Sequence, residues 1–196
     1  MIPTIACVLK SGGIYGPEHV ASLKSNVANH IGGHRFVCLS DIDVPCERIP
    51  LKHNWPGWWS KLELFRSELF DGPVLYLDLD TVVTGDLTPL VAENGFIITT
   101  DWWGGGFQSS VMSWNGNQPF YMMFAPEIHM QIGGGDQEFL HRTMPKAARY
   151  EEGLVVSYKA HCESGLPQNA RVVCFHGTPK QWDVTDDWVK KETSEI

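Results

Sequence analysis

The stretch over residues 74–83, VLYLDLDTVV, constrains the fold of this chain more than any other. Four apolar residues run into two acids separated by one leucine, and apolar residues then resume. A continuous apolar run bounded by turn residues is typical of a strand that is buried on both faces of a parallel sheet. Side chains alternate along a strand, so Asp78 and Asp80 are expected to point the same way, with Cα atoms ~6.6 Å apart. We therefore expect an α/β protein with this stretch at the centre of its sheet.

Two carboxylates at the carboxyl end of a central strand lie where open α/β sheets bind their ligands. Hard oxygen ligands suit Mg²⁺ or Mn²⁺, and such an ion would in turn hold phosphate. A plainer interpretation is also open, in which the strand ends in a turn and the two acids only cap and solvate it.

The segments on either side predict a mainly parallel sheet flanked by helices. Strands are expected over residues 3–9 and 35–39, with a helix between them that begins at Pro17 and ends at the glycine pair 32–33. Such a unit implies parallel strands and a right-handed crossover. Later strands are expected over 95–100, 108–115 and 171–175, and a helix over about 59–70 with Leu62, Phe65 and Leu69 on its buried face. With no repeat or linker in view, residues 1–196 are expected to form a single domain.

Polar residues follow several of the predicted strands. The glycine-rich turn over residues 10–16 comes directly after the first strand, where α/β folds receive phosphates or nucleosides. Ser11 and Asp41 fall at the ends of the first two strands, so contacts to a base or ribose are expected there.

The segment before the central stretch is rich in tryptophan. Trp58 and Trp59 are equally compatible with a stacking platform for a base or sugar and with ordinary core packing. Lys61 could reach the end of the central strand, although its spacing alone favours a solvated lysine.

Two later segments add candidate site residues. A glycine run precedes Asp136, which is predicted to be a helix N-cap, and capping alone would explain this residue. His176 follows the last predicted strand, and Lys180 comes four residues later, so an imidazole and an ammonium could surround one anion. Taken by itself, His176 would more often be an ordinary, partly buried histidine.

Composition excludes some classes of function. The net charge is −8, and the 15 basic residues do not cluster, which argues against nucleic-acid binding because that affinity rests on neutralising many phosphates. Neither a signal peptide nor an apolar run of membrane-spanning length is evident. The five cysteines are odd in number and lack C-x-x-C spacing, which favours reduced thiols and a cytoplasmic location.

In order and spacing, these motifs resemble those of the glycogenin family, the retaining GT-A glycosyltransferases of family 8. Residues 5–15 are similar to the family's first strand and nucleotide loop, and Asp78-Leu79-Asp80 to its DxD motif. Asp136-Gln137 resembles the family's Asp-Gln pair, and the segment 175–182, FHGTPKQW, resembles its closing His-x-Gly-x-x-Lys-x-Trp pattern. The resemblance spans roughly residues 3–183.

The resemblance implies a GT-A fold and the transfer of a hexose, with retention, from a UDP-sugar to a glycan, lipid or protein acceptor. It implies that Mn²⁺ or Mg²⁺ is held by Asp78, Asp80 and His176. It further implies catalytic roles for Asp136, Gln137 and Lys180. Nucleotide contacts are implied for Leu9, Lys10, Ser11, Tyr15, Asp41, Lys61, Asp78, Gly177 and Lys180.

The chain also departs from this pattern, and two alternatives remain open. The family's Phe-Asn-Ser-Gly strand appears here as FQSS over residues 107–110, which affects the contacts to sugar and acceptor. A haloacid-dehalogenase-type phosphatase would use Asp78 as a covalent nucleophile in a D-x-D-x-T/V motif. In that class the motif follows the first strand, whereas here a whole βαβ unit precedes it. The second alternative is a catalytically degenerate module that binds a nucleotide sugar.

Overall fold

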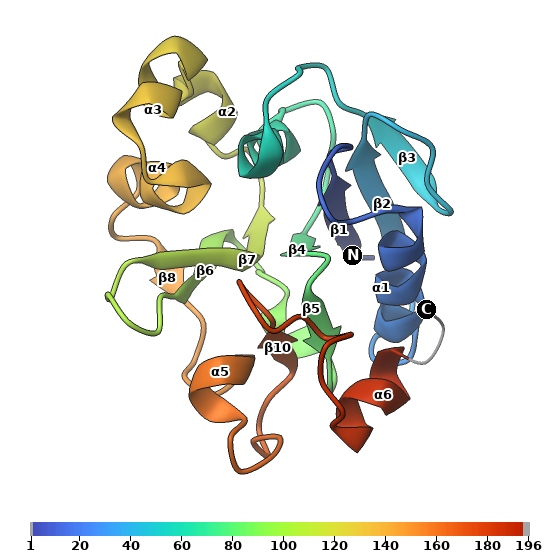
Figure 1. Ribbon diagram of the computed structural model, residues 1–196. Helices are drawn as coiled ribbons and strands as arrows, with labels where there is room; N and C mark the ends of the chain where they lie inside the picture. The colour runs from blue at the N-terminus through green and yellow to red at the C-terminus, as the bar shows by residue number, and fades with distance from the viewer. Residues whose placement is uncertain (1, 194–196) are drawn as a thin grey trace.

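The computed structural model describes residues 2–193 and has a seven-stranded sheet at its centre (Figure 1). Its strand order is β3-β2-β1-β4-β7-β6-β8, and only β7 runs against its neighbours. The mainly parallel α/β sheet that the sequence predicts is therefore confirmed. The strands are β1 (Thr4–Leu9), β2 (Arg35–Ser40), β3 (Glu47–Pro50), β4 (Val74–Leu77), β6 (Gly95–Thr100), β7 (Phe107–Asn115) and β8 (Ala148–Arg149).

The central stretch is split between two sheets, which corrects the expected single strand. β4 ends at Leu77, the chain turns at Asp78, whose carbonyl accepts the Thr81 N–H at 3.2 Å, and β5 (Thr81–Val83) begins a second sheet. That three-stranded sheet has the order β5-β10-β9, with β9 (Val155–Ser157) and β10 (Val172–Cys174). The Asp78 N–H still donates to the Ser110 carbonyl of β7 at 2.9 Å, but Asp80 lies in the turn, so the alternation of a strand does not extend from Asp78 to Asp80.

Helices cover both faces of the large sheet because β1 is apolar on both. Ile5 and Cys7 pack with α1 (Pro17–Ala28), whereas Ala6 packs on the other face with Leu62 of η1 (Gly57–Phe65) and Phe139 of α4 (Gly135–Thr143). Figure 1 shows α2 (Phe120–Met123), α3 (Pro126–Ile132) and α4 together on one side. The remaining helices are η2 (Thr88–Leu90), α5 (Tyr158–His161) and α6 (Asp187–Thr193).

The helix expected over residues 59–70 is wrong in type and in length. The segment Gly57–Phe65 is a 3₁₀ helix, and the backbone becomes extended at Arg66. Leu62 and Phe65 are buried as expected, but Leu69 lies outside the helix and is only partly buried. The buried carboxylate of Glu63 accepts the backbone N–H groups of Lys52 and His53 at 2.7 and 2.9 Å, which ties the helix to the preceding loop.

All five cysteines are free thiols, and four of them are buried. Within residues 2–193, the helices are too short and too polar for any of them to cross a membrane.

Candidate active site

A cavity of about 630 Å³ opens at the carboxyl ends of β1 and β4. The turn after β1 forms one wall, η1 forms another, and the turn after β4 brings in both acids of the Asp-Leu-Asp motif. This is the edge of the sheet where α/β folds bind ligands, and the volume suits a ligand of nucleotide size. The predicted site residues that line the cavity are Lys10, Ser11, Tyr15, Lys61, Asp78 and Asp80.

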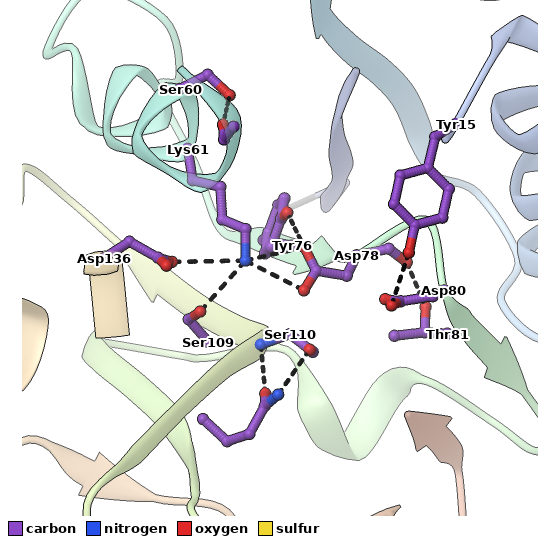
Figure 2. A network of polar contacts seen from close by, with 12 residues as sticks. Tyr15, Ser60, Lys61, Tyr76, Asp78, Asp80, Thr81, Ser109, Ser110 and Asp136 are labelled. Atoms are coloured by element: carbon purple, nitrogen blue, oxygen red, sulfur yellow. Dashed lines mark hydrogen bonds and ion pairs between the residues drawn. The ribbon is translucent and has the colours of Figure 1, made fainter. Parts of the chain in front are cut away.

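Lys61 joins two acids from different parts of the chain (Figure 2). Its Nζ lies 3.0 Å from Asp78 Oδ1 and 3.4 Å from Asp136 Oδ2, and it donates to Ser109 Oγ at 3.2 Å. Burial by itself lowers the pKa of Lys61, but Asp136 and Asp78 outweigh it, so the pKa lies above the usual value. Lys61 is therefore a buried ammonium, and the solvated lysine favoured by spacing alone is wrong.

Asp136 is not the helix N-cap that the sequence predicts. α4 begins at Gly135 after Gly134, so Asp136 lies inside the first turn and makes no capping bond. The side chain of Asp136 is buried, and its Oδ2 makes no hydrogen bond among the described residues, although it is ion-paired with Lys61 Nζ at 3.4 Å. A buried carboxylate oxygen that makes no hydrogen bond is rare in proteins, and a catalytic role or a bound ion or water is among its explanations. Gln137 is half-buried beside it in the same turn.

Asp80 is held by two donors on one oxygen. Its Oδ2 accepts from Lys180 Nζ at 2.5 Å. The same oxygen accepts from the Tyr15 hydroxyl at 2.9 Å (Figure 2). Burial and then the neighbouring Asp78 raise the pKa of Asp80, whereas Lys180 and Tyr15 act in the opposite direction. Asp78 in turn accepts from the Tyr76 hydroxyl.

The contacts of His176 are with residues other than Asp78 and Asp80. Its Nε2 is 2.8 Å from Ser157 Oγ, and its ring stacks on Trp102 with centroids 5.1 Å apart. Burial, and then Lys159 and Lys180, lower the pKa of His176 to about 4, so the ring is neutral at pH 7. Trp103 packs edge-on against the same ring at 5.0 Å.

The predicted metal centre is only partly assembled. Asp78 and Asp80 line one cavity, and their hard oxygens fit Mg²⁺ or Mn²⁺. Across the described part of the chain, however, no group of three His, Cys, Asp or Glu side chains lies close enough to hold an ion. The two carboxylates thus fit a divalent cation, whereas His176 does not join them in this arrangement.

The turn after β1 is fixed to the end of β2. Asp41 accepts from Lys10 Nζ at 2.5 Å and from the Ser11 N–H and hydroxyl at 2.9 and 2.7 Å. Burial alone would raise the pKa of Asp41, but Lys10 and Ser11 lower it to about 2. The Leu9 side chain is buried in the core, which leaves only its backbone for a nucleotide. Gly177 has φ +70°, and a Cβ there would lie 3.1 Å from Lys159 Nζ.

The structure separates the two tryptophans that the sequence could not distinguish. Trp59 is buried and stacks on Phe124 with centroids 5.2 Å apart, so it belongs to the core. Trp58 is 58% exposed and lines the cavity. Its indole Nε1 would lie 3.0 Å from a Cβ at Gly135, so the glycine allows the ring to pack against the start of α4.

Sequence reasoning missed several residues that hold the site. Tyr76 lies two residues before Asp78, and the period of a strand could have placed both on one face. Ser157 carried no such signal, whereas Ser109 lies in the FQSS segment that departs from the family's pattern. In the departing segment of β7, Gln108 folds back and bonds Ser110, with its Oε1 accepting the Ser110 N–H.

Comparison with known proteins gives a likeness in structure alone. No family model matches the chain, and no curated protein matches its sequence. Among solved structures, the apo glycosyltransferase GlyE of Streptococcus pneumoniae TIGR4 superposes with a TM-score of 0.72 at 16% identity, over 99% of this chain and 60% of GlyE. The galactosyltransferase LgtC, solved with donor and acceptor sugar analogues, gives 0.67 at 17%, over 98% of this chain and 94% of LgtC.

The bifunctional glycosyltransferase WbbM gives a TM-score of 0.67 at 13% identity, over 98% of this chain and 50% of WbbM. The chain thus spans about 60% of the length of GlyE and half of WbbM. These likenesses show the fold: a mixed α/β domain with a mostly parallel central sheet, as in known glycosyltransferases.

Proposed function

We propose that this chain is a glycosyltransferase that moves a hexose from a UDP-sugar, with retention of configuration, to a glycan, lipid or protein acceptor. The observation that carries the proposal is the 630 Å³ cavity, which two close acids and Lys61 line at the carboxyl ends of β1 and β4. The fold alone would not suffice, because one fold hosts many chemistries. The structurally similar glycosyltransferases GlyE and LgtC support sugar transfer, a reaction that is consistent with both the fold and the cavity.

The chemistry of the leaving group explains why cations are needed. When the bond between the sugar and the diphosphate breaks, negative charge develops on the leaving oxygen, and fixed positive charge lowers that barrier. Lys180 supplies such a charge from its position beside Asp80, and Lys61 supplies another beside Asp78. A divalent cation held by Asp78 and Asp80, with neutral His176 as a candidate third ligand, would add Lewis-acid stabilisation of the same charge.

The remaining residues bind and orient the donor. Tyr15 lines the cavity and is assigned to the base, while Ser11 and Asp41 fix the turn against which the nucleotide rests. The Oδ2 of Asp136 is ion-paired with Lys61 but makes no hydrogen bond among the described residues, and it is assigned to a sugar hydroxyl or to the positive charge that develops at the anomeric carbon. Gln137 follows in the same helical turn and is assigned to the transferred sugar as well.

The test is to measure UDP release and sugar transfer from a panel of UDP-sugars, with Mn²⁺ and with a chelator. We expect turnover in Mn²⁺, and we expect Asp80→Asn to lower kcat by about 10²- to 10³-fold, the cost of losing one charge-stabilising group. His176→Ala is measured alongside. Asp86→Asn is the matched control, because within residues 2–193 the Asp86 carboxylate accepts its hydrogen bonds from Thr88 and does not line the cavity.

Each contrary outcome points to a different conclusion. Turnover unchanged by the chelator, by Asp80→Asn and by His176→Ala rejects the mechanism. A phosphoenzyme trapped on Asp78 supports the phosphatase alternative. Tight UDP binding without turnover on any acceptor supports the degenerate binding module.

A further inference from the structure

The place beside Asp80 where a metal ion would bind already holds a positive charge. Lys180 Nζ lies 2.5 Å from Asp80 Oδ2, the same oxygen that accepts from the Tyr15 hydroxyl at 2.9 Å. The ammonium also lies over the Tyr15 ring, 5.5 Å from its centroid. The side chains of Lys180 and Asp80 are only 13% and 11% exposed, so water screens this pair weakly.

The backbone around this ion pair is firmly tied. Lys180 Nζ donates to the Phe175 carbonyl at 3.1 Å, and the Phe175 N–H donates to the Asp80 carbonyl at 2.8 Å. Gln181 Nε2 donates to the Leu79 carbonyl at 3.0 Å, which joins the loop after β10 to the Asp-Leu-Asp turn. With the backbone tied, a new partner for the ammonium needs rotation of the flexible Lys180 side chain only.

The ion pair lies at the boundary between two cavities. Asp80 lines the cavity described above, Lys180 lines a second, more open cavity of about 690 Å³ with Thr178 and Trp182, and Ile14 lines both. An anion bound across this boundary meets the ammonium, and a cation bound beside Asp78 meets the carboxylate. The two kinds of ligand therefore act on opposite members of one ion pair.

An ammonium and a divalent cation repel each other at contact distance, and the largely buried setting strengthens that repulsion. They cannot both lie against Asp80 Oδ2. A diphosphate changes the balance, because its oxygens give the ammonium a new partner and also give the divalent cation further oxygen ligands.

We propose that Lys180 and a divalent cation compete for Asp80, and that a diphosphate ends the competition by drawing the ammonium onto itself. The diphosphate as ligand rests on the proposed function, whereas the competition needs only the ion, Lys180 and Asp80. The ion alone then binds weakly, and ion and diphosphate each raise the affinity for the other by the same factor.

The test is Lys180→Met, which keeps the length of the side chain and removes the charge. Mn²⁺ binding without nucleotide is followed by the electron paramagnetic resonance of free Mn²⁺, and UDP binding in chelator is followed by calorimetry. We expect the Kd for Mn²⁺ to fall by about 5- to 150-fold, the usual range of coupling between two ligands, and the Kd for UDP without metal to rise by at least about fivefold. A merely structural role would not move the two affinities in opposite directions.

Three controls locate the effect. Lys159→Met removes the same charge from a lysine that lies over the Trp103 ring, 5.8 Å from its centroid. It should change the Mn²⁺ affinity by less than about threefold, because the charges that act most on Asp80 are Asp78 and Lys180. Asp80→Asn in the Lys180→Met background should abolish the gain. Lys180→Arg keeps the charge, so it should bind Mn²⁺ as weakly as the parent, and thermal melting checks that each variant is folded.

An Mn²⁺ affinity that is unchanged, weaker or undetectable in folded Lys180→Met overturns the proposal. Its failure is distinguishable from that of the proposed function. If the Mn²⁺ and UDP affinities shift in opposite directions but no UDP-sugar is turned over, the proposed glycosyltransferase function is rejected and the competition for Asp80 is supported. If turnover depends on Mn²⁺ but Lys180→Met gains no Mn²⁺ affinity, the competition for Asp80 is rejected and the proposed function is supported.

Discussion

Acids at the carboxyl ends of the parallel strands are each held by a lysine from another part of the chain. Asp78 pairs with Lys61, Asp80 with Lys180, and Asp41 with Lys10. In a protein with a net charge of −8, these few lysines supply the local positive charge that an anionic ligand needs. The lysines are bound to protein carboxylates, so an anion must compete with those carboxylates for them.

At the scale of single residues, the sequence predicted which residues lie at the strand ends better than it predicted which side chains they contact. Asp78, Asp80 and Lys61 were expected near one strand end, and all three line the cavity. The bond between Lys180 and Asp80 joins residues 100 positions apart, so only the folded chain reveals it. His176 was expected at a metal, but its ring faces Ser157 and Trp102, residues for which the sequence offered no pairing signal.

Lys61→Met is expected to destabilise the protein strongly. Removing this buried ammonium leaves Asp78 and Asp136 close together without their shared cation, and breaking a buried pair in this way costs about 3–5 kcal/mol. Urea unfolding at pH 7 measures the loss. Adding Asp136→Asn to the variant should recover part of it.

The control for that measurement is Lys52→Met. Lys52 pairs with Glu68 at the surface, where the two side chains are 57% and 52% exposed, so its loss should cost at most about 1 kcal/mol. If Lys61→Met costs no more than Lys52→Met, Lys61 does not hold the two acids as described.

At the scale of secondary-structure elements, the pattern of apolar residues predicted where the strands lie in the sequence but not which sheet each strand joins. Residues 74–83 have one unbroken pattern, yet β4 pairs with β1 and β7, whereas β5 pairs with β10. The break falls at the two acids because the Thr81 hydroxyl and N–H both donate to the Asp78 carbonyl, which closes a turn. A local turn of this kind competes with an extended strand, and an apolar pattern does not report it.

The sequence also did not predict that η1 is a 3₁₀ helix, and this type of helix decides which side chains face the cavity. Residues three apart eclipse in a 3₁₀ helix, so Trp58 and Lys61 form one row, and both line the cavity. Apolar spacing of three or four residues fits either kind of helix, so it predicted the buried Leu62 and Phe65 but not this row.

The segment over residues 101–106 is expected to control the titration of His176. Burial, to which the stacked Trp102 contributes, is the main reason why the pKa of His176 falls to about 4. Trp102→Ala should expose the ring and raise the pKa toward 6.5, although Lys159 and Lys180 still oppose protonation and Asp101 favours it. Titration of the His176 ring protons by NMR measures the change.

The sign of the effect on stability follows from the same shift. The folded-state pKa lies below the unfolded value, so between pH 6.5 and about 4 the unfolded chain binds more protons, and the free energy of unfolding falls as the pH falls. Trp102→Ala should flatten that slope. The control is Trp182→Ala, which removes a ring that packs on Tyr15 and His19 instead. Equal titration of His176 in both variants would contradict this account.

At the scale of the whole molecule, the parallel sheet and its ligand-binding edge were predictable, because strand period and short crossovers leave few topologies. The edge strand β8, the second sheet and the antiparallel β7 were not, since each depends on pairing between distant segments. The fold matches GlyE and LgtC at only 16% and 17% identity, so sequences that differ at most positions form this sheet.

The most direct test of the account is a crystal structure of the protein with UDP and Mn²⁺. We predict that UDP occupies the cavity between Tyr15 and Lys61, that the ion lies on Asp78 and Asp80, and that Lys180 has turned from Asp80 to the diphosphate. UDP bound outside this cavity, or UDP within it while Lys180 still holds Asp80 and neither acid holds an ion, would contradict the account.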